Sequence, residues 1–208
     1  MIAVVDYGVG NLFSLTSSLK AVGAPARVTA DAGEISRAAG IILPGVGAFG
    51  DARAKLDATG LVPVLKERAA AGVPLLGICL GMQLLFERSS EYGVHEGLGL
   101  LAGEVVPFRL PEGYKIPHMG WNSLRFLRPC PLLKYAAEGD YVYYVHSYHA
   151  AGCEDSLVAV SDYGVTVPGL VARGNIFGAQ FHPEKSGSVG LGMLRAFAEL
   201  CAGGEAGA

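Results

Sequence analysis

Short apolar runs alternate with stretches of helical periodicity along the first half of the chain. A helix is expected over residues 11–22, where apolar residues recur at intervals of three and four. A second helical stretch, residues 52–71, contains Gly60 and Pro63, which we expect to break it into two pieces. Strands are expected at residues 2–5, 26–29, 40–43 and 74–78. This βαβα order predicts an α/β fold with a mostly parallel sheet and helices on both of its faces.

The second half of the chain is richer in short strand-like segments. Strands are expected at residues 104–108, 122–126, 140–148, 157–161, 166–173 and 175–181. Gly174, between the last two, predicts a tight hairpin. We expect these strands to form an antiparallel layer added to the parallel core, within a single domain of residues 1–208, because no linker separates the halves. A closing helix is expected over residues 186–201, followed by a frayed tail over 203–208.

Composition restricts the classes of protein to which the chain can belong. Its 208 residues are 51% hydrophobic and carry a net charge of −3, which suits a globular domain with a large core. The lack of a basic stripe argues against a nucleic-acid partner, and no apolar run approaches the roughly 18 residues needed to cross a membrane. The four cysteines lack paired spacing, and no basic leader precedes the first apolar residues. We therefore expect a reduced, cytoplasmic protein.

Cys79 lies in the run Gly-Ile-Cys-Leu-Gly, where the expected strand 74–78 turns directly into a helix-like segment. Gly77 and Gly81 keep Cβ atoms away from this turn, so the thiol is expected to stand exposed above the sheet. A helix N-terminus at that point favours the thiolate. The alternative is a buried cysteine that packs like a small apolar side chain. A partner base is needed to decide between the two.

A candidate base, His182, follows the expected strand 175–181, and Glu184 stands two residues beyond it. A thiol nucleophile needs an imidazole to hold its proton and a carboxylate to orient that imidazole. Side chains two apart in an extended stretch point the same way, and Pro183 restricts the chain between them. Taken alone, His182 reads as a solvated loop residue. Because His182 and Cys79 both follow apolar strands, both are expected at the carboxyl edge of a parallel sheet.

Attack on a carbonyl group creates an oxyanion, which backbone N–H groups usually stabilise. One donor is expected at Leu80, directly after the nucleophile. The others are expected at Gly45 and Val46, within a glycine loop that spans residues 44–47, because glycines let backbone amides converge on one point. A phosphate-binding loop is the rival interpretation, but the segment lacks the lysine and the spacing of that motif. A third interpretation is that the segment is an ordinary turn without a binding role.

The motifs GICLGMQ and HPE together resemble the triad-type, class-I glutamine amidotransferases, and the resemblance runs over nearly the whole chain. It implies a flavodoxin-like fold and the hydrolysis of L-glutamine to glutamate and ammonia, without a cofactor or a metal. It also implies that Cys79 is the nucleophile, that His182 is the general base and acid, and that Glu184 is the orienting carboxylate.

The same resemblance implies that Gln83 helps to hold glutamine and that the backbone near Ser147 and Tyr148 grips its α-amino acid end. Further segments, which are more selective than the triad, resemble the glutaminase subunits of the imidazole glycerol phosphate synthase family. They are DYGVGNL, PGVGAFGD, PHMGWN and HPEKSG. That second resemblance implies a heterodimer with a (β/α)8-barrel cyclase. The cyclase would use the ammonia to make imidazole glycerol phosphate and an aminoimidazole carboxamide ribotide in histidine biosynthesis.

The surface facing this partner is expected to carry residues of the kinds that anchor interfaces. The candidates are Tyr7, Asn11, His118, Met119, Trp121 and Lys185. Met119 and Trp121 could equally be core residues, whereas the resemblance implies that Lys185 faces the synthase subunit. We also expect the glycine loop to complete the oxyanion hole only when the partner has bound its own substrate, which would gate the reaction.

Three alternatives stay open. A stand-alone cysteine hydrolase would use the same three catalytic side chains, but it has no need of the DYGVGNL, PHMGWN and HPEKSG segments. Amidotransferases of anthranilate, guanylate or pyridoxal phosphate synthesis are nearer, although Met82 stands where several of them carry histidine. A metal-binding module would have to use the histidines at 118, 146, 149 and 182. Residues 146 and 149 are poor co-ligands, because positions three apart in a strand point to opposite faces.

Overall fold

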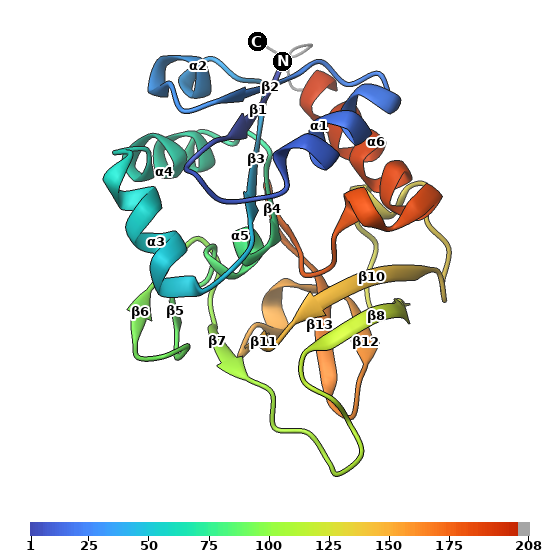
Figure 1. Ribbon diagram of the computed structural model, residues 1–208. Coiled ribbons are helices and arrows are strands. Elements are labelled where there is room, and N and C mark those ends of the chain that lie inside the picture. The colour runs from blue at the N-terminus through green and yellow to red at the C-terminus, as the bar shows by residue number, and fades with distance from the viewer. Residues whose placement is uncertain (204–208) are drawn as a thin grey trace.

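The computed structural model describes residues 1–203, and its centre is an eight-stranded sheet (Figure 1). The strand order is β2-β1-β3-β4-β14-β13-β12-β9. Strands β2, β1, β3, β4 and β14 run parallel to one another. Strands β13, β12 and β9 continue the sheet with antiparallel pairing. The bounds are β1 Ile2–Val5, β2 Ala26–Thr29, β3 Gly40–Gly45, β4 Leu75–Cys79, β9 Arg125–Phe126, β12 Leu157–Asp162, β13 Thr166–Arg173 and β14 Ile176–Ala179.

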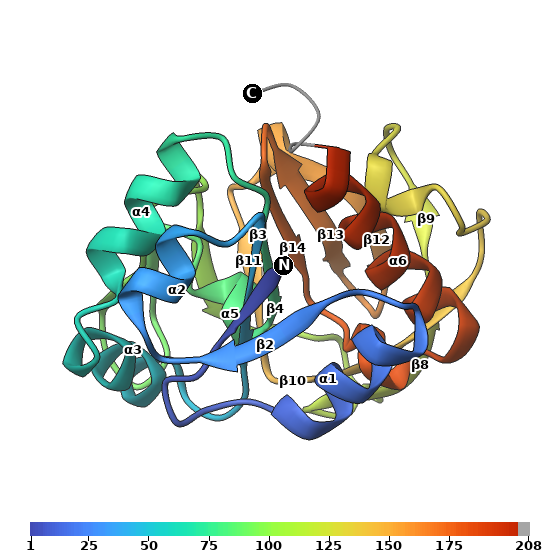
Figure 2. The same ribbon diagram turned by 90° about the horizontal axis from the view of Figure 1, so that it is seen from above.

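Helices cover both faces of this sheet (Figure 2). One face carries α1 (Leu12–Ala21) and α6 (Gly187–Gly203), and the other carries α2 (Ala32–Ser36), α3 (Phe49–Ala58) and α4 (Val62–Ala70). Each face packs over its own cluster of buried aliphatic and aromatic side chains, which leaves the inner strands β1, β3 and β4 buried on both sides, whereas β2 at the sheet edge is partly exposed. Within residues 1–203, no helix is long and apolar enough to cross a membrane.

Two small sheets stand at the carboxyl end of the parallel strands (Figure 1). One pairs β8 (His118–Ser123) with β10 (Tyr141–His146) in antiparallel fashion. The other has the order β11-β7-β5-β6, with bounds β5 Arg88–Ser89, β6 His95–Glu96, β7 Glu104–Pro107 and β11 Tyr148–Ala151. A single helical turn, α5 (Leu80–Gln83), follows β4 directly. Turns of 3₁₀ helix lie at Pro131–Leu133, Glu154–Ser156 and Pro183–Lys185.

The expected α/β architecture is confirmed, with several differences in detail. The expected strand 175–181 is not part of an antiparallel layer, because β14 lies parallel to β4 in the core sheet, and the short strands β5 and β6 were not predicted. Residues 140–148 are not one strand, because the chain changes sheet at Ser147, between β10 and β11. Residues 122–126 are likewise divided between β8 and β9, and β8 begins at His118. The helix α2 was not predicted, since five residues are too few to show a helical period. The hairpin at Gly174, whose φ is 57°, is confirmed, whereas the tail after residue 203 lies outside the described residues.

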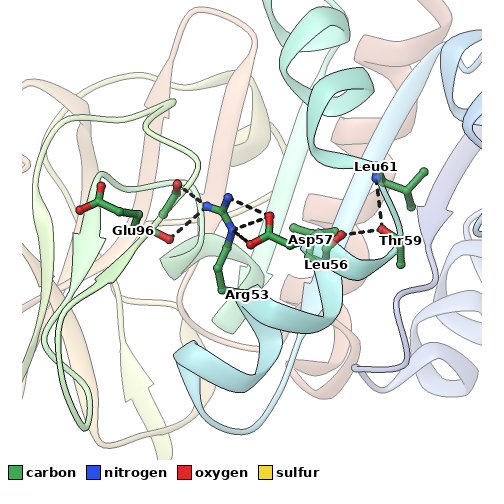
Figure 3. Close-up of polar contacts among 7 residues, drawn as sticks. Arg53, Leu56, Asp57, Thr59, Leu61 and Glu96 are labelled. Atoms are coloured by element: carbon green, nitrogen blue, oxygen red, sulfur yellow. Dashed lines mark hydrogen bonds and ion pairs between the residues drawn. The ribbon is translucent and has the colours of Figure 1, made fainter.

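Arg53 fixes the position of α3, the helix that begins just after the glycine loop (Figure 3). Its guanidinium Nε lies 3.1 Å from Asp57 Oδ1 on the same helix, and Nη1 donates to the backbone oxygens of Glu96 and Gly97 at the end of β6. The Thr59 hydroxyl donates to a carbonyl oxygen of the last turn of α3. The downstream end of the glycine loop is therefore tied to the β5–β6 hairpin.

Candidate active site

Cys79 ends β4 at the carboxyl edge of the sheet, with φ 54° and ψ −113°, a strained conformation for a residue that has a side chain. Gly77 and Gly81 permit this turn. A Cβ atom on Gly81 would lie 1.8 Å from the carbonyl oxygen of Leu43, and one on Gly77 would lie 2.6 Å from that of Gly81. The tight turn expected from the sequence is present, but the expectation of an exposed thiol was wrong, because Cys79 is only 6% exposed and reaches the pocket from a buried position. The helix α5 is a single turn, so its dipole at Cys79 is weaker than that of a long helix.

His182 and Glu184 form the expected pair, with Nδ1 2.9 Å from Oε1 and both side chains only 3% exposed. The loop that carries them is held by the backbone: the His182 N–H donates to Tyr143 O, and the Ser186 hydroxyl donates to His182 O. Since the carboxylate accepts from Nδ1, the other ring nitrogen is left for proton transfer. That nitrogen, Nε2, is buried and has no hydrogen-bond partner among residues 1–203.

The charge state of His182 follows from its neighbours. Burial lowers the pKa of His182, but Cys79 and the Glu184 carboxylate outweigh burial and raise that pKa to about 9. The folded protein therefore binds this proton more tightly than an unfolded chain, whose histidines titrate near a pKa of about 6.5. The resulting stabilisation is complete below about pH 6.5 and is lost as the pH rises through about 9.

Replacing Glu184 with glutamine is expected to lower kcat for glutamine about 100-fold, because an amide does not stabilise the imidazolium. The pKa of His182 is expected to fall, since one of the groups that raise it is lost. An NMR pH titration of the His182 ring measures this pKa, and steady-state kinetics measure kcat. An unchanged pKa together with an unchanged kcat would show that Glu184 does not act on His182.

Cys79 and His182 open into one pocket of about 290 Å³, at the small end of the usual range for small-molecule sites. Its lining consists of Val46, Gly47, Cys79, Leu80, Gln83, Glu91, Pro117, Val145, His146, Ser147, Tyr148 and His182. All three candidates for glutamine binding thus meet at the nucleophile, together with two of the three candidates for the oxyanion hole. The third, Gly45, lies outside the lining, and Gly47 occupies the wall in its place.

The glycine loop, residues 44–47, closely approaches the tight turn at Cys79. Gly45 is the register partner of Cys79, and a Cβ atom on it would lie 2.6 Å from the backbone nitrogen of Gly81. The hydroxyl of Tyr7, from the opening DYGVGNL segment, donates to Pro44 O at 2.7 Å and anchors the start of the loop. Gly47 has a φ of 94°, which favours glycine. A side chain at Gly45 would therefore clash with the backbone that follows Cys79, whereas a Cβ atom on Gly47 would meet no atom within 4 Å.

Gln83 is buried and sits between the pocket and a second glutamine that the sequence did not reveal. Its Nε2 donates to Tyr148 O and to Gln180 Oε1, both at 3.0 Å. The Nε2 of Gln180 in turn lies 3.9 Å from the thiol of Cys79. Gln180 stands two residues before His182, so extended-strand periodicity was the one signal that could have placed both on the same side.

Glu91 is the second lining residue that sequence reasoning missed. It is 8% exposed, and its Oε2 accepts a hydrogen bond of 2.7 Å from the backbone N–H of Phe49 at the start of α3. It lies in a Ser-Ser-Glu-Tyr loop with no recognisable motif, and its partner is 42 residues away in sequence. A carboxylate in this wall gives the pocket a binding partner for a cationic group.

The interface candidates divide into exposed and buried residues. Met119 and Trp121 are 60% and 56% exposed on β8, so they are not core residues. Lys185 is exposed, with its ammonium 5.7 Å from the centre of the Tyr143 ring. Asn11 is partly exposed and caps α1 by accepting from the Ser14 N–H. The expectation for two further residues, Tyr7 and His118, was wrong, because they are 4% and 2% exposed and hydrogen-bond inside the protein.

The histidines considered as metal ligands have other roles in the structure. Two of them, His118 and His146, are hydrogen-bonded to each other, and His182 is paired with Glu184. Within the described part of the chain, no three histidine, cysteine, aspartate or glutamate side chains are grouped so that they could hold a metal ion.

Comparison with known proteins gives this site a family. The model of the family described as "Glutamine amidotransferase class-I" matches residues 3–199. The chain is 58% identical to "Imidazole glycerol phosphate synthase subunit HisH" of Bacillus cereus (strain G9842), over 95% of this chain and 93% of that protein. It is 51% identical to the subunit HisH of Geobacillus kaustophilus (strain HTA426), over 98% of each chain.

Solved structures support the fold independently. A structure titled "Crystal structure of glutamine amidotransferase" covers 97% of this chain and all of that one, with a TM-score of 0.76 at 18% identity. "Structure of PurLQS from Thermotoga maritima" covers 95% and 97%, with a TM-score of 0.73 at 20% identity. The chain therefore belongs to the class-I glutamine amidotransferase family and, within it, to the imidazole glycerol phosphate synthase subunits HisH.

Proposed function

We propose that this chain hydrolyses the side-chain amide of L-glutamine at Cys79 and passes the ammonia to a cyclase subunit. That subunit uses the ammonia to make imidazole glycerol phosphate and an aminoimidazole carboxamide ribotide in histidine biosynthesis. The observation that carries the proposal is the convergence of a strained cysteine and a buried histidine–glutamate pair on one small pocket. Membership of the HisH group supports the identity of both the substrate and the partner.

The pocket suits the free amino acid. In this proposal the Glu91 carboxylate binds the α-ammonium group of glutamine, and backbone N–H groups near Ser147 and Tyr148 bind its α-carboxylate, which is supported by the presence of all three residues in the pocket lining. Gln83 holds Tyr148 in position through its amide. The side-chain amide of the substrate then points toward Cys79. Recognition of both charged ends favours glutamine over a glutamine residue within a peptide.

The reaction proceeds through a covalent thioester. The thiolate of Cys79 attacks the carbonyl carbon of the substrate amide, and the C–N bond breaks as the protonated His182 gives its proton to the departing nitrogen, so that ammonia leaves. His182 then takes a proton from water, which attacks the thioester and releases glutamate and the thiol. The oxyanion of each step is stabilised by backbone N–H groups of Leu80 and Val46, which line the pocket, whereas the third candidate, Gly45, lies outside the lining.

A glutaminase assay on the purified chain tests the proposal, with and without the cyclase subunit and a ligand of that subunit. Ammonia release that rises strongly on addition of the liganded cyclase is expected, because the exposed glycine loop is then completed as an oxyanion hole. Full-rate hydrolysis by the isolated chain would favour a stand-alone hydrolase. No ammonia under any condition would exclude the enzymatic function.

The partner is expected to be a barrel-type cyclase that covers the exposed side of β8. Replacing Trp121 with alanine is expected to weaken the heterodimer about 30-fold, or about 2 kcal/mol, because a large exposed aromatic side chain of this kind is a typical interface anchor. Isothermal titration calorimetry measures the affinity. Leu127→Ala is the matched control, since Leu127 is also exposed but follows β9, the edge strand of the eight-stranded sheet, and does not lie on β8. Equal affinities of the two variants would place the interface elsewhere.

A further inference from the structure

A chain of side-chain hydrogen bonds runs from β8 to the backbone of β11, and it reaches the pocket lining at His146. Asn122 Nδ2 lies 3.2 Å from His118 Nε2, and His118 Nδ1 lies 3.0 Å from His146 Nε2. His146 Nδ1 lies 2.8 Å from the carbonyl oxygen of Tyr148. Neither the nucleophile nor its histidine–glutamate pair belongs to this chain of contacts, so the proposed mechanism leaves it unexplained.

The chain of contacts permits only one arrangement of protons when both rings are neutral. A carbonyl oxygen only accepts hydrogen bonds, so His146 carries its proton on Nδ1. Its Nε2 must then accept, and the donor is His118 Nδ1. The Nε2 of His118 accepts in turn from Asn122, whose amide also donates to Asp162 O at 2.9 Å. Both imidazoles are therefore protonated on Nδ1 alone.

The surroundings keep both rings neutral and in place. His118 and His146 are 2% and 7% exposed, and burial lowers the pKa of His118 to about 4 and that of His146 to about 3. The His118 ring is stacked between Tyr144 and Tyr163, with centroids 4.5 and 4.0 Å away. The ring of Phe108 packs against His146 at 5.1 Å. The pair is thus a rigid element at neutral pH and not a proton carrier.

The pair ends on the part of the pocket that faces the substrate. The carbonyl oxygen of Tyr148 accepts from His146 on one side and from Gln83 on the other. Tyr148 is also the first residue of β11, immediately after the change of sheet at Ser147. Tyr148 pairs with Pro107 of β7, and proline has no N–H to donate, so the donors to the Tyr148 carbonyl are the side chains of His146 and Gln83.

We propose that His118 and His146 are positioning residues which, as a neutral pair protonated on Nδ1, hold the Tyr148 carbonyl and Gln83 in the arrangement that binds the α-amino acid end of glutamine. This inference rests on the proposed glutaminase function. Because the pair does not touch the scissile amide, its loss weakens glutamine binding and leaves the chemical step nearly unchanged.

The protonation pattern can be tested on the whole chain without an activity assay. Long-range ¹H–¹⁵N NMR spectra of protein labelled at histidine distinguish the two neutral tautomers and the cation. Both His118 and His146 are expected as the Nδ1–H tautomer at pH 7. Finding either ring as the Nε2–H tautomer, or charged, would overturn the proposal.

Kinetics of the complex with the cyclase test the consequence. His118→Phe keeps a ring between the two tyrosines but removes the donor to His146, and it is expected to raise KM for glutamine about 10-fold, with kcat within about threefold of the wild type. His118→Asn keeps a donor at the Nδ1 position, and it is expected to restore KM to within about threefold. The matched control is His149→Phe, in the same aromatic cluster but outside the chain of contacts, with KM unchanged.

The outcomes separate this inference from the function on which it rests. Wild-type complex without glutaminase activity would refute the function, while the NMR spectra would still decide the tautomers. An active wild type with an unchanged KM in His118→Phe would refute the positioning role. Equal rises of KM in the Phe and Asn variants at 118 would also refute it, because loss of packing would then explain both. Thermal melting of each variant confirms that the assays are made on folded protein.

Discussion

Alanine in place of Cys79 is expected to abolish glutamine hydrolysis, with kcat at least about 10⁵-fold below that of the wild type. The thiol is the one nucleophile at the end of β4, and the strained φ of 54° exists to present it to the pocket beside His182. Water in its place would have to attack the amide directly, without a covalent intermediate. Release of ammonia from glutamine by the complex with the cyclase, followed over hours, measures the residual rate.

The same variant provides its own control, because the cyclase can be supplied with ammonium salt in place of glutamine. The Cys79→Ala complex is expected to make the cyclase product from ammonium at the wild-type rate, which would show that folding and assembly are intact. Cys130→Ala is the matched substitution, since Cys130 lies before the 3₁₀ turn Pro131–Leu133, outside the pocket lining. Glutamine hydrolysis that survives in Cys79→Ala, or fails in Cys130→Ala, would contradict the assignment of the nucleophile.

The residues proposed as catalytic could be recognised in the sequence because each part of the candidate site is local. The turn at Cys79 is marked by two glycines within a five-residue run that follows an apolar strand, and the histidine–glutamate pair spans three residues. Side-chain periodicity and the steric freedom of glycine act over three to five residues, so the local sequence pattern is enough to predict this geometry. The parallel pairing of the first four strands could be predicted in the same way, since alternation of apolar runs and helices implies parallel pairing, but their order in the sheet was not predicted.

The side chains that support the site could not be predicted from the sequence, because their partners are remote in sequence. Gln83 meets Gln180 across 97 residues, and His118 meets His146 across 28. Such pairs depend on which strands adjoin, and the change of sheet at Ser147 leaves no mark in the alternation of residues 140–148. Tyr7 shows the opposite error: its side-chain type suits an interface, yet it is buried, and its hydroxyl anchors the glycine loop.

Replacing Gly81 with alanine is expected to lower the free energy of unfolding by about 4 kcal/mol or more, which is at the upper end for a single substitution. The added Cβ would lie 1.8 Å from the carbonyl oxygen of Leu43 and 3.1 Å from the carbonyl carbon of Pro44. Both atoms belong to the backbone of β3, which pairs with β1 on one side and β4 on the other. Because neither neighbour can rotate away, β3 and α5 must separate.

Urea denaturation measures this loss, and it is best compared with Gly203→Ala, where the new methyl group meets no atom within 4 Å and stability is expected to change by less than about 0.5 kcal/mol. Any Gly81→Ala protein that folds should also lose glutaminase activity, because separation of β3 from α5 moves the glycine loop away from Cys79. A variant with wild-type stability would show that β3 yields to the methyl group. A variant that is destabilised but fully active would show that the turn at Cys79 and the glycine loop move together and keep their relative positions.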